Sequence, residues 1–302
     1  MDTSDMTLNV IYTANTALPL SRFALTLLRW SACRVRLVAN GCAAEEEARL
    51  QTLALGNPRL SFFSFSPGAS LTHGQVLNHL HDECDEPIFA FVDSDLFAVG
   101  PFMPAKLSAP LVCFLPPAAF WTQEEESRQR QRHRLGCTYF ALYDNQVLRD
   151  LRRRWGVGFD KGRWKELSQA QQTQLQALNY VQPRYDTGKL LNALLASEGK
   201  TVAFADTSNL RHLGGSSRSK MMRHWTWRHW LRRLLTDWRA ALRRRRLRQA
   251  KSQADIYFAE LLDALAQGSP LPDMPRCDPY VRNKITVMTA EIIQLHTDER
   301  LK

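Results

Sequence analysis

Short apolar runs alternate with longer amphipathic stretches along most of the chain. The runs have the composition of β-strands, and the stretches carry apolar residues at the three- and four-residue steps of helices. The run at residues 87–92 is apolar almost throughout, which is typical of a strand buried on both faces. Strands are expected at residues 8–12, 34–39, 59–65, 87–92, 111–115, 137–142 and 201–205, and helices at residues 18–30, 43–55, 72–81, 168–180 and 187–198.

This alternation predicts an α/β fold with a mostly parallel central sheet flanked by helices. The polar stretch at residues 123–134 is expected to be an exposed helix or a mobile loop. After residue 213 the composition changes sharply, because two glycines and two serines lead into a tract rich in tryptophan and arginine. The rest of the chain is expected to form a helical C-terminal extension.

The positive charge of the chain is concentrated in one segment. The 302 residues include 40 Lys and Arg against 30 Asp and Glu, yet residues 211–251 contain a single acid, Asp237. The longest apolar run, residues 109–121, is broken by proline and too short to span a bilayer, and no export signal is seen. The six cysteines lack Cys-x-x-Cys spacing, so we expect reduced thiols in a cytoplasmic protein.

Two carboxylates follow directly on the buried run. In open α/β sheets ligands bind at the carboxyl ends of the strands, so Asp93 and Asp95 are expected at the rim of such a crevice. One acid can bind a divalent cation while the other accepts hydrogen bonds from a sugar hydroxyl. Oxygen ligands suit Mg²⁺ or Mn²⁺ bridging a diphosphate. The structural alternative is an ordinary Asp-rich turn.

The context of this pair resembles GT-A glycosyltransferases, especially enzymes of the family-two type. In residues 68–78 and 91–97 a glycine turn and a helix precede the acidic pair, as in that family. The resemblance continues in order with Asp186-Thr-Gly-Lys-Leu-Leu, a helix, the strand at residues 201–205 and then His212. It covers roughly residues 8–215.

The resemblance implies an enzyme that moves a sugar from a nucleotide-diphosphate donor to a hydroxyl of a glycan or lipid-linked acceptor, using Mn²⁺ or Mg²⁺. It implies a nucleotide-sugar-binding half at residues 1–105 and an acceptor-binding, catalytic half at residues 106–220. Residues 221–302 are then a basic, helical extension.

The resemblance also implies roles for individual side chains. Asp95 is the metal ligand, Asp93 contacts the ribose or the metal, and His212 binds the metal or a phosphate. Asp186 is the catalytic base. The requirements of the chemistry agree, since the leaving diphosphate needs its charge neutralised and the acceptor hydroxyl needs a base. The side chains expected to bind the nucleotide sugar are Asn15, Asn40, His73, Asp93 and Ser94.

The sequence departs from the family at two points. Asn40 and Gly41 stand where typical members end the second strand with an aspartate that reads the nucleobase. Tyr185 replaces the acid that usually precedes the second acidic residue, which leaves Asp186 as the candidate base, and inversion of the anomeric configuration is expected. The structural alternatives are that Asp186 caps the following helix and that His212 is a surface histidine.

The basic tract predicts an amphipathic helix at residues 227–242, with one aromatic and aliphatic face and arginines on the rest. Such a helix could pack its apolar stripe on the catalytic domain, which is the usual role of amphipathic helices. It could instead lie on an anionic membrane surface, making the protein peripheral to the inner face of the membrane. Nucleic-acid binding is the least favoured reading, because no known binding motif surrounds the tract.

Two other functions compete with glycosyl transfer. A nucleotidyltransferase would also use an acidic metal site, but it should carry a basic, glycine-rich loop near the first strand, which residues 12–20 lack. A non-catalytic basic adaptor could bind anionic membrane or nucleic acid through residues 211–251. The complete set of Asp93, Asp95, Asp186 and His212 favours an enzyme over the adaptor.

Overall fold

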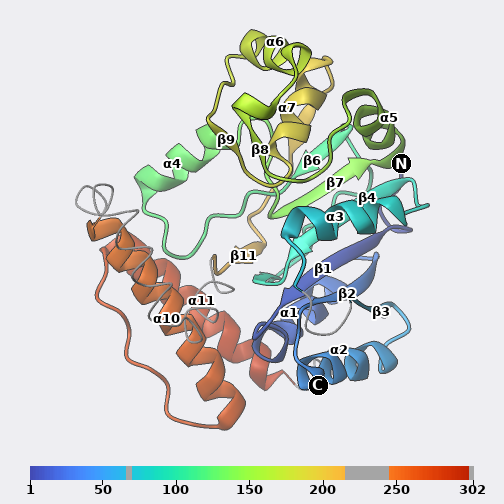
Figure 1. Ribbon diagram of the computed structural model, residues 1–302. Helices are drawn as coiled ribbons and strands as arrows, with labels where there is room; N and C mark the ends of the chain where they lie inside the picture. Colours follow the sequence, from blue (N-terminus) through green and yellow to red (C-terminus); the bar gives the residue numbers. More distant parts are fainter. Residues whose placement is uncertain (66–69, 215–244, 299–302) are drawn as a thin grey trace.

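The computed structural model describes residues 1–65, 70–214 and 245–298 (Figure 1). Its strands are β1 (Thr7–Thr13), β2 (Arg34–Asn40), β3 (Leu60–Ser64), β4 (Ile88–Asp93), β5 (Leu96–Ala98), β6 (Leu111–Cys113), β7 (Phe140–Asp144), β8 (Gly162–Arg163), β9 (Arg184–Tyr185), β10 (Val202–Phe204) and β11 (Leu210–His212). Its α-helices are α1 (Ala17–Arg29), α2 (Ala44–Leu55), α3 (His73–Asp82), α4 (Gln123–Arg132), α5 (Asn145–Trp155), α6 (Gln169–Ala177), α7 (Lys189–Ser197), α10 (Arg245–Gln267) and α11 (Pro279–Thr297).

Seven strands form the central sheet in the order β10-β6-β7-β4-β1-β2-β3. Neighbouring strands run parallel except around β7, which pairs antiparallel with both β4 and β6. The expected α/β class with a mostly parallel sheet is therefore confirmed. In register, Ile11 of β1 lies beside Asp93 of β4, and Thr13 lies beside Asn40 of β2. The carboxyl ends of these three strands thus meet at one edge of the sheet.

The sheet is buried on both faces, as the apolar run of β4 predicts. Along this strand Ile88, Ala90 and Val92 pack into one hydrophobic cluster, and Phe89 and Phe91 pack into the other. Residues of α1, α10 and α11 belong to the first cluster, and residues of α3, α5 and α7 belong to the second. Figure 1 shows the two layers of helices on opposite sides of the sheet.

The helical C-terminal extension lies against α1 (Figure 1). Arg29 of α1 pairs with Asp298 at 2.8 Å, and the Arg22 guanidinium donates to the His296 carbonyl at 2.8 Å. None of the described helices combines the length and apolarity needed to cross a membrane. The predicted helix at residues 227–242 falls outside the described residues.

The structure adds elements that the sequence pattern did not predict. Helix α5 follows β7 directly, and the short strands β5 and β11 pair with each other outside the main sheet. Residues 123–134 form the exposed-helix alternative as α4. All six cysteines are free thiols, as expected.

Candidate active site

Strand β4 ends in the first residue of the acidic pair. The backbone N–H of Asp93 donates to the Tyr139 carbonyl at 2.8 Å. Burial, and then the negative charge of Asp95, raise the pKa of the Asp93 carboxyl well above its usual value. The two neighbouring carboxylates therefore repel each other when both are ionised, and a cation at this point would favour the ionised pair.

Asp95 and His212 lie side by side. Strand β5 starts directly after Asp95 and pairs antiparallel with β11, which sets His212 opposite Leu96. Nε2 of His212 is 3.6 Å from Oδ1 of Asp95, and both side chains are buried. The Leu213 N–H also donates to the Asp95 carbonyl at 3.1 Å. His212 is thus buried beside Asp95 and is not a surface histidine.

Aromatic rings and a backbone bond hold His212 in this position. The ring centroids of Tyr139 and Trp121 lie 4.9 Å and 6.3 Å from the centroid of its imidazole. The Ala119 N–H donates to the His212 carbonyl at 3.0 Å. Packing therefore fixes the ring in its orientation toward Asp95.

Helix α11 contacts both segments that flank His212. Arg211 forms a bidentate ion pair with Glu291, in which Nε is 2.9 Å from Oε2 and Nη2 is 2.9 Å from Oε1. The Lys284 ammonium donates to the first and last carbonyls of residues 118–121, at 3.1 Å and 2.5 Å. The first contact holds β11, and the second holds the loop that bonds to His212. We call these two contacts the α11 brace.

His73 at the start of α3 lies close to Asp93 and also interacts electrostatically with Asp186. Its Nε2 lies 4.0 Å from Oδ1 of Asp93, and the charge of Asp186 also acts on the ring. Burial lowers the pKa of His73 to about 4, although Asp186 opposes this shift. The imidazole is therefore neutral near pH 7.

Asp186 is a half-exposed carboxylate on the loop before α7. Its Oδ1 accepts from the Thr187 N–H at 3.0 Å and lies 3.3 Å from the Lys161 ammonium. Partial burial opposes the shift, but the Thr187 N–H and Lys161 together lower the pKa of this carboxyl. The first helical residue is Lys189, and Gly188 takes the N-cap position with a φ of 68°. Asp186 is thus not the residue that caps this helix.

Asn40 and Asn15 lie at the same edge of the sheet, where β2 and β1 end. The Asn40 amide bonds in both directions to the backbone of Leu71, donating at 3.0 Å and accepting at 2.9 Å. Asn15 has a φ of 66°, and its N–H donates to Glu46 at 2.9 Å. Ser94, between the two acids, is buried. These contacts give Asn40 a structural task, and its contact with a nucleobase stays a prediction.

Asp93, Asp95 and His212 carry the oxygen and nitrogen donors that a divalent cation binds. The described residues contain no group of three or more His, Cys, Asp or Glu that could hold a metal ion by themselves. Mg²⁺ sites in nucleotide enzymes commonly use one or two carboxylates, with substrate phosphates and water as the other ligands. Asp95 and His212, with donor atoms 3.6 Å apart, match that kind of partial site. Asp93, whose ionised form is disfavoured by burial and then by the charge of Asp95, is the next candidate ligand.

Three residues of the site were not predicted from the sequence. Lys161 reaches Asp186 from the loop after α5, and Tyr139 packs on His212. Glu46 of α2 is buried and accepts from the N–H groups of Asn15 and Ala17, each at 2.9 Å, as well as from an N–H at its own helix start. A glutamate at the third position of a helix is a recognisable sequence signal for a side chain that accepts from backbone N–H groups at the helix start. No sequence signal near Lys161 predicts its contact with Asp186.

No protein-family model matches the chain, and no curated protein matches it. Three solved structures with a similar arrangement are glycosyltransferases. The mannosyltransferase PcManGT from Pyrobaculum calidifontis, in complex with GDP-Man and Mn²⁺, is 12% identical at a TM-score of 0.46, covering 98% of this chain and 88% of that one. S. aureus TarS 1-349 is 13% identical at 0.41, covering 96% and 90%, and the galactosyltransferase LgtC with donor and acceptor sugar analogs is 14% identical at 0.38, covering 67% and 74%.

Proposed function

We propose that the chain is a metal-dependent glycosyltransferase of the GT-A type. It would transfer a hexose from a nucleotide-diphosphate donor to a hydroxyl of a glycan or lipid-linked acceptor. The observation that carries the proposal is the meeting of Asp95 and His212 at the carboxyl end of β4, the place where open α/β sheets bind ligands. The order of the motifs along the sequence supports the same reading.

The donor is proposed to bind at the edge where β1, β2 and β4 end. Asp93, Asp95 and His212 would hold Mn²⁺ or Mg²⁺, which supplies the positive charge that stabilises a departing diphosphate. Because Asp95 and His212 are buried, this charge would act in a site that excludes much of the water. The side chains proposed to contact the nucleotide sugar are Asn15, Asn40, His73, Asp93 and Ser94.

Asp186 is proposed as the base. The acceptor oxygen attacks the anomeric carbon while the bond from that carbon to the diphosphate oxygen breaks, and the electron pair leaves with the diphosphate. The hydroxyl proton passes to the Asp186 carboxylate. The Thr187 N–H and then Lys161, 3.3 Å from Oδ1, keep this carboxylate ionised before the acceptor arrives. Attack opposite the leaving group inverts the anomeric configuration.

The adaptor alternative depends on residues 211–251. Within that range Arg211 is engaged by Glu291 inside the protein, and residues 215–244 lie outside the described chain. No described contact favours this alternative over transfer. A membrane-surface role for the tract stays a prediction that vesicle flotation would test.

The proposed function is tested by a donor screen. The full chain would be incubated with UDP-, GDP- and CDP-sugars, including GDP-mannose, with Mn²⁺ or with chelator, and released nucleotide diphosphate would be measured. We expect release from at least one donor with Mn²⁺ and loss of release with chelator. Equal release in both conditions, or no binding of any nucleotide diphosphate with Mn²⁺, would refute a metal-dependent transferase.

A further inference from the structure

A cavity of about 480 Å³ lies between α3 and α5, away from the acidic pair. Helix α3 starts at His73 beside Asp93, and His81 in its last turn is about 12 Å further along the helix axis. We call this space the α3–α5 cavity. The polar side chains that line it are Asn78, His81, Asp82, Arg149, Arg152 and Arg153.

Three arginines and one carboxylate line the cavity. Each arginine has a carboxylate partner, Asp85 for Arg149 at 3.7 Å, Asp82 for Arg152 at 2.7 Å and Asp150 for Arg153 at 3.6 Å. Arg149, Arg152 and Arg153 share one face of α5, because residues three and four apart are neighbours on a helix. Two of them belong to the last turn, where the helix dipole favours cations. The fold therefore holds a cluster of guanidinium groups against the cavity.

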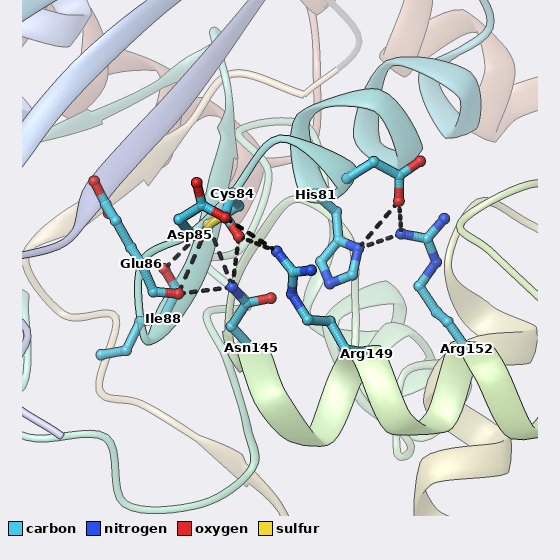
Figure 2. A network of polar contacts seen from close by, with 9 residues as sticks. His81, Cys84, Asp85, Glu86, Ile88, Asn145, Arg149 and Arg152 are labelled. Carbon is cyan, nitrogen blue, oxygen red and sulfur yellow. Dashed lines mark hydrogen bonds and ion pairs between the residues drawn. The ribbon is translucent and has the colours of Figure 1, made fainter.

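Protein contacts fix two of these guanidinium groups (Figure 2). Arg152 Nη1 donates to Asp82 Oδ1 at 2.7 Å and also to His81 Nδ1. Arg149 Nη2 donates to the Cys84 carbonyl at 2.5 Å and lies 3.7 Å from Asp85 Oδ1. Both aspartates are solvent-exposed, so water screens their charges. The arginines are thus held in place by exposed ion pairs, and because solvent weakens these pairs the cluster can still attract an anion.

His81 lines the cavity as a buried side chain. Nδ1 of His81 faces both the Arg152 guanidinium, which can only donate, and the Asp82 carboxylate at 3.7 Å. Burial, and then the charge of Arg152, lower the pKa of His81 to about 4, so the ring is neutral. Nε2 has no hydrogen-bond partner among the described residues. Figure 2 shows the ring between Arg149 and Arg152.

We propose that the α3–α5 cavity binds the phosphate group of a phosphorylated ligand, at a site separate from the proposed donor site. Phosphate oxygens accept from arginine in the bidentate manner that guanidinium geometry favours. The volume exceeds that of a phosphate, which leaves room for a sugar-sized polar group. The proposal does not depend on glycosyl transfer, because it uses none of the residues assigned to that reaction.

Calorimetry in the presence of chelator tests the proposal, since chelator removes cation-mediated binding at the acidic pair. Inorganic phosphate and glucose 6-phosphate would be titrated into the full chain. We expect saturable binding that the double variant Arg149→Gln/Arg152→Gln weakens at least about tenfold, as expected for lost charge-assisted hydrogen bonds. The control Arg128→Gln/Arg130→Gln removes the same charge from exposed positions of α4 and should bind like the wild type. Equal weakening in both double variants would mean general electrostatic attraction and would overturn the site.

Two further measurements keep the test decisive. In the wild type, the imidazole signals of His81, which lines the cavity beside both arginines, should move in nitrogen-15 NMR on addition of phosphate. Unmoved signals at saturation would overturn the proposal even if the double variant misfolds. Flotation with phosphatidic acid vesicles separates the sources of the phosphate. Vesicle binding that the double variant alone abolishes assigns a lipid headgroup, and binding of glucose 6-phosphate without vesicle binding assigns a soluble ligand. Binding to none of these probes overturns the site.

Discussion

Oδ1 of Asp95 and Nε2 of His212 lie 3.6 Å apart, although one follows β4 and the other ends β11. A carboxylate and an imidazole at this spacing can share a ligand that is attractive to both, and a divalent cation is such a ligand. The antiparallel pairing of β5 with β11 creates this relationship.

Asp95→Ala and His212→Ala should each weaken Mn²⁺-dependent binding of nucleotide diphosphate by about tenfold or more, because each removes one ligand from a partial site that has few others. Calorimetry with and without Mn²⁺ measures the effect. Asp206→Ala, which removes an exposed carboxylate from the loop before β11, is the matched control and should bind normally. Unchanged binding in Asp95→Ala with an intact fold would contradict the assignment of the acidic pair.

Asp186→Asn should leave donor binding nearly intact and reduce turnover by about 10²–10⁴, the range for a lost general base. The amide keeps the size of the side chain but cannot take the proton. Single-turnover kinetics with saturating donor separates the two effects. If donor affinity falls while turnover persists, Asp186 positions the donor rather than acting as the base.

Lys161→Met should move the acid limb of the kcat/KM profile to higher pH. Lys161 helps to lower the pKa of Asp186, so in the wild type the base stays ionised at pH values below the usual range for aspartate. Without the ammonium, protonation of Asp186 begins at higher pH and the rate falls earlier on acidification. Lys165→Met, at a nearby exposed position, is the control. An acid limb unchanged in Lys161→Met would show that this ion pair does not tune the base.

Lys284→Met should weaken Mn²⁺ binding by about three- to tenfold without removing any proposed ligand, because it removes one of the two contacts of the α11 brace, the one that holds the loop bonded to His212. Lys284→Arg should restore part of the affinity, since a guanidinium can still donate to the two carbonyls. Asp298→Asn cuts a contact between the end of α11 and Arg29, away from the site, and serves as the control. Equal effects of Lys284→Met and Asp298→Asn would indicate a general loss of stability instead.

Glu46→Ala should lower the free energy of unfolding by about 2–4 kcal/mol, because it leaves buried N–H groups without their charged acceptor. The same change should raise the donor KM, since the loop that carries Asn15 loses its support. Glu45→Ala removes an exposed acid from the same helix turn and should be nearly neutral. Urea unfolding measured together with donor kinetics would detect both effects.

Stability should fall on acidification from about pH 6.5 towards pH 4. Burial lowers the pKa of His81 to about 4 and of His133 to about 3, so the unfolded chain binds protons in this window and the folded chain does not. Each histidine contributes a slope of up to about 1.4 kcal/mol per pH unit. His133→Asn should reduce the slope in urea unfolding at pH 7, 6 and 5, with the exposed His79→Asn as the control. Identical slopes in wild type and His133→Asn would exclude this origin.

The sequence was enough to predict the core of the fold. The apolar runs that form β1, β2 and β4 are buried on both faces. A short, continuous apolar run is the pattern that predicts such a buried strand. Helix α5 was not predicted because its four arginines obscure a stripe of only three aliphatic residues. The end of α5 could be predicted from the sequence, because glycine commonly ends a helix in the left-handed conformation, and Gly156 does so with a φ of 61°.

The sequence predicts only those parts of the candidate site whose residues lie next to each other along the chain. Asp93 and Asp95 follow from the end of β4, whereas the approach of His212 depends on the pairing of two three-residue strands, too short to show any period. Lys161 reaches Asp186 through a loop conformation. Gly74 permits this approach, since a Cβ there would lie 2.8 Å from the Cα of Asp160. Such tertiary contacts leave no pattern in the residues themselves.

The pairing of β5 with β11 also has a consequence for folding. Contacts between segments far apart in the chain cost loop-closure entropy before they contribute stability, so they tend to form late. The central sheet around β1, β2 and β4 can assemble from nearer segments, while the Asp95–His212 contact must wait for β11 to return to β5. A refolding experiment should therefore recover secondary structure before Mn²⁺ binding, and substitutions that weaken β11 should slow the second event more than the first.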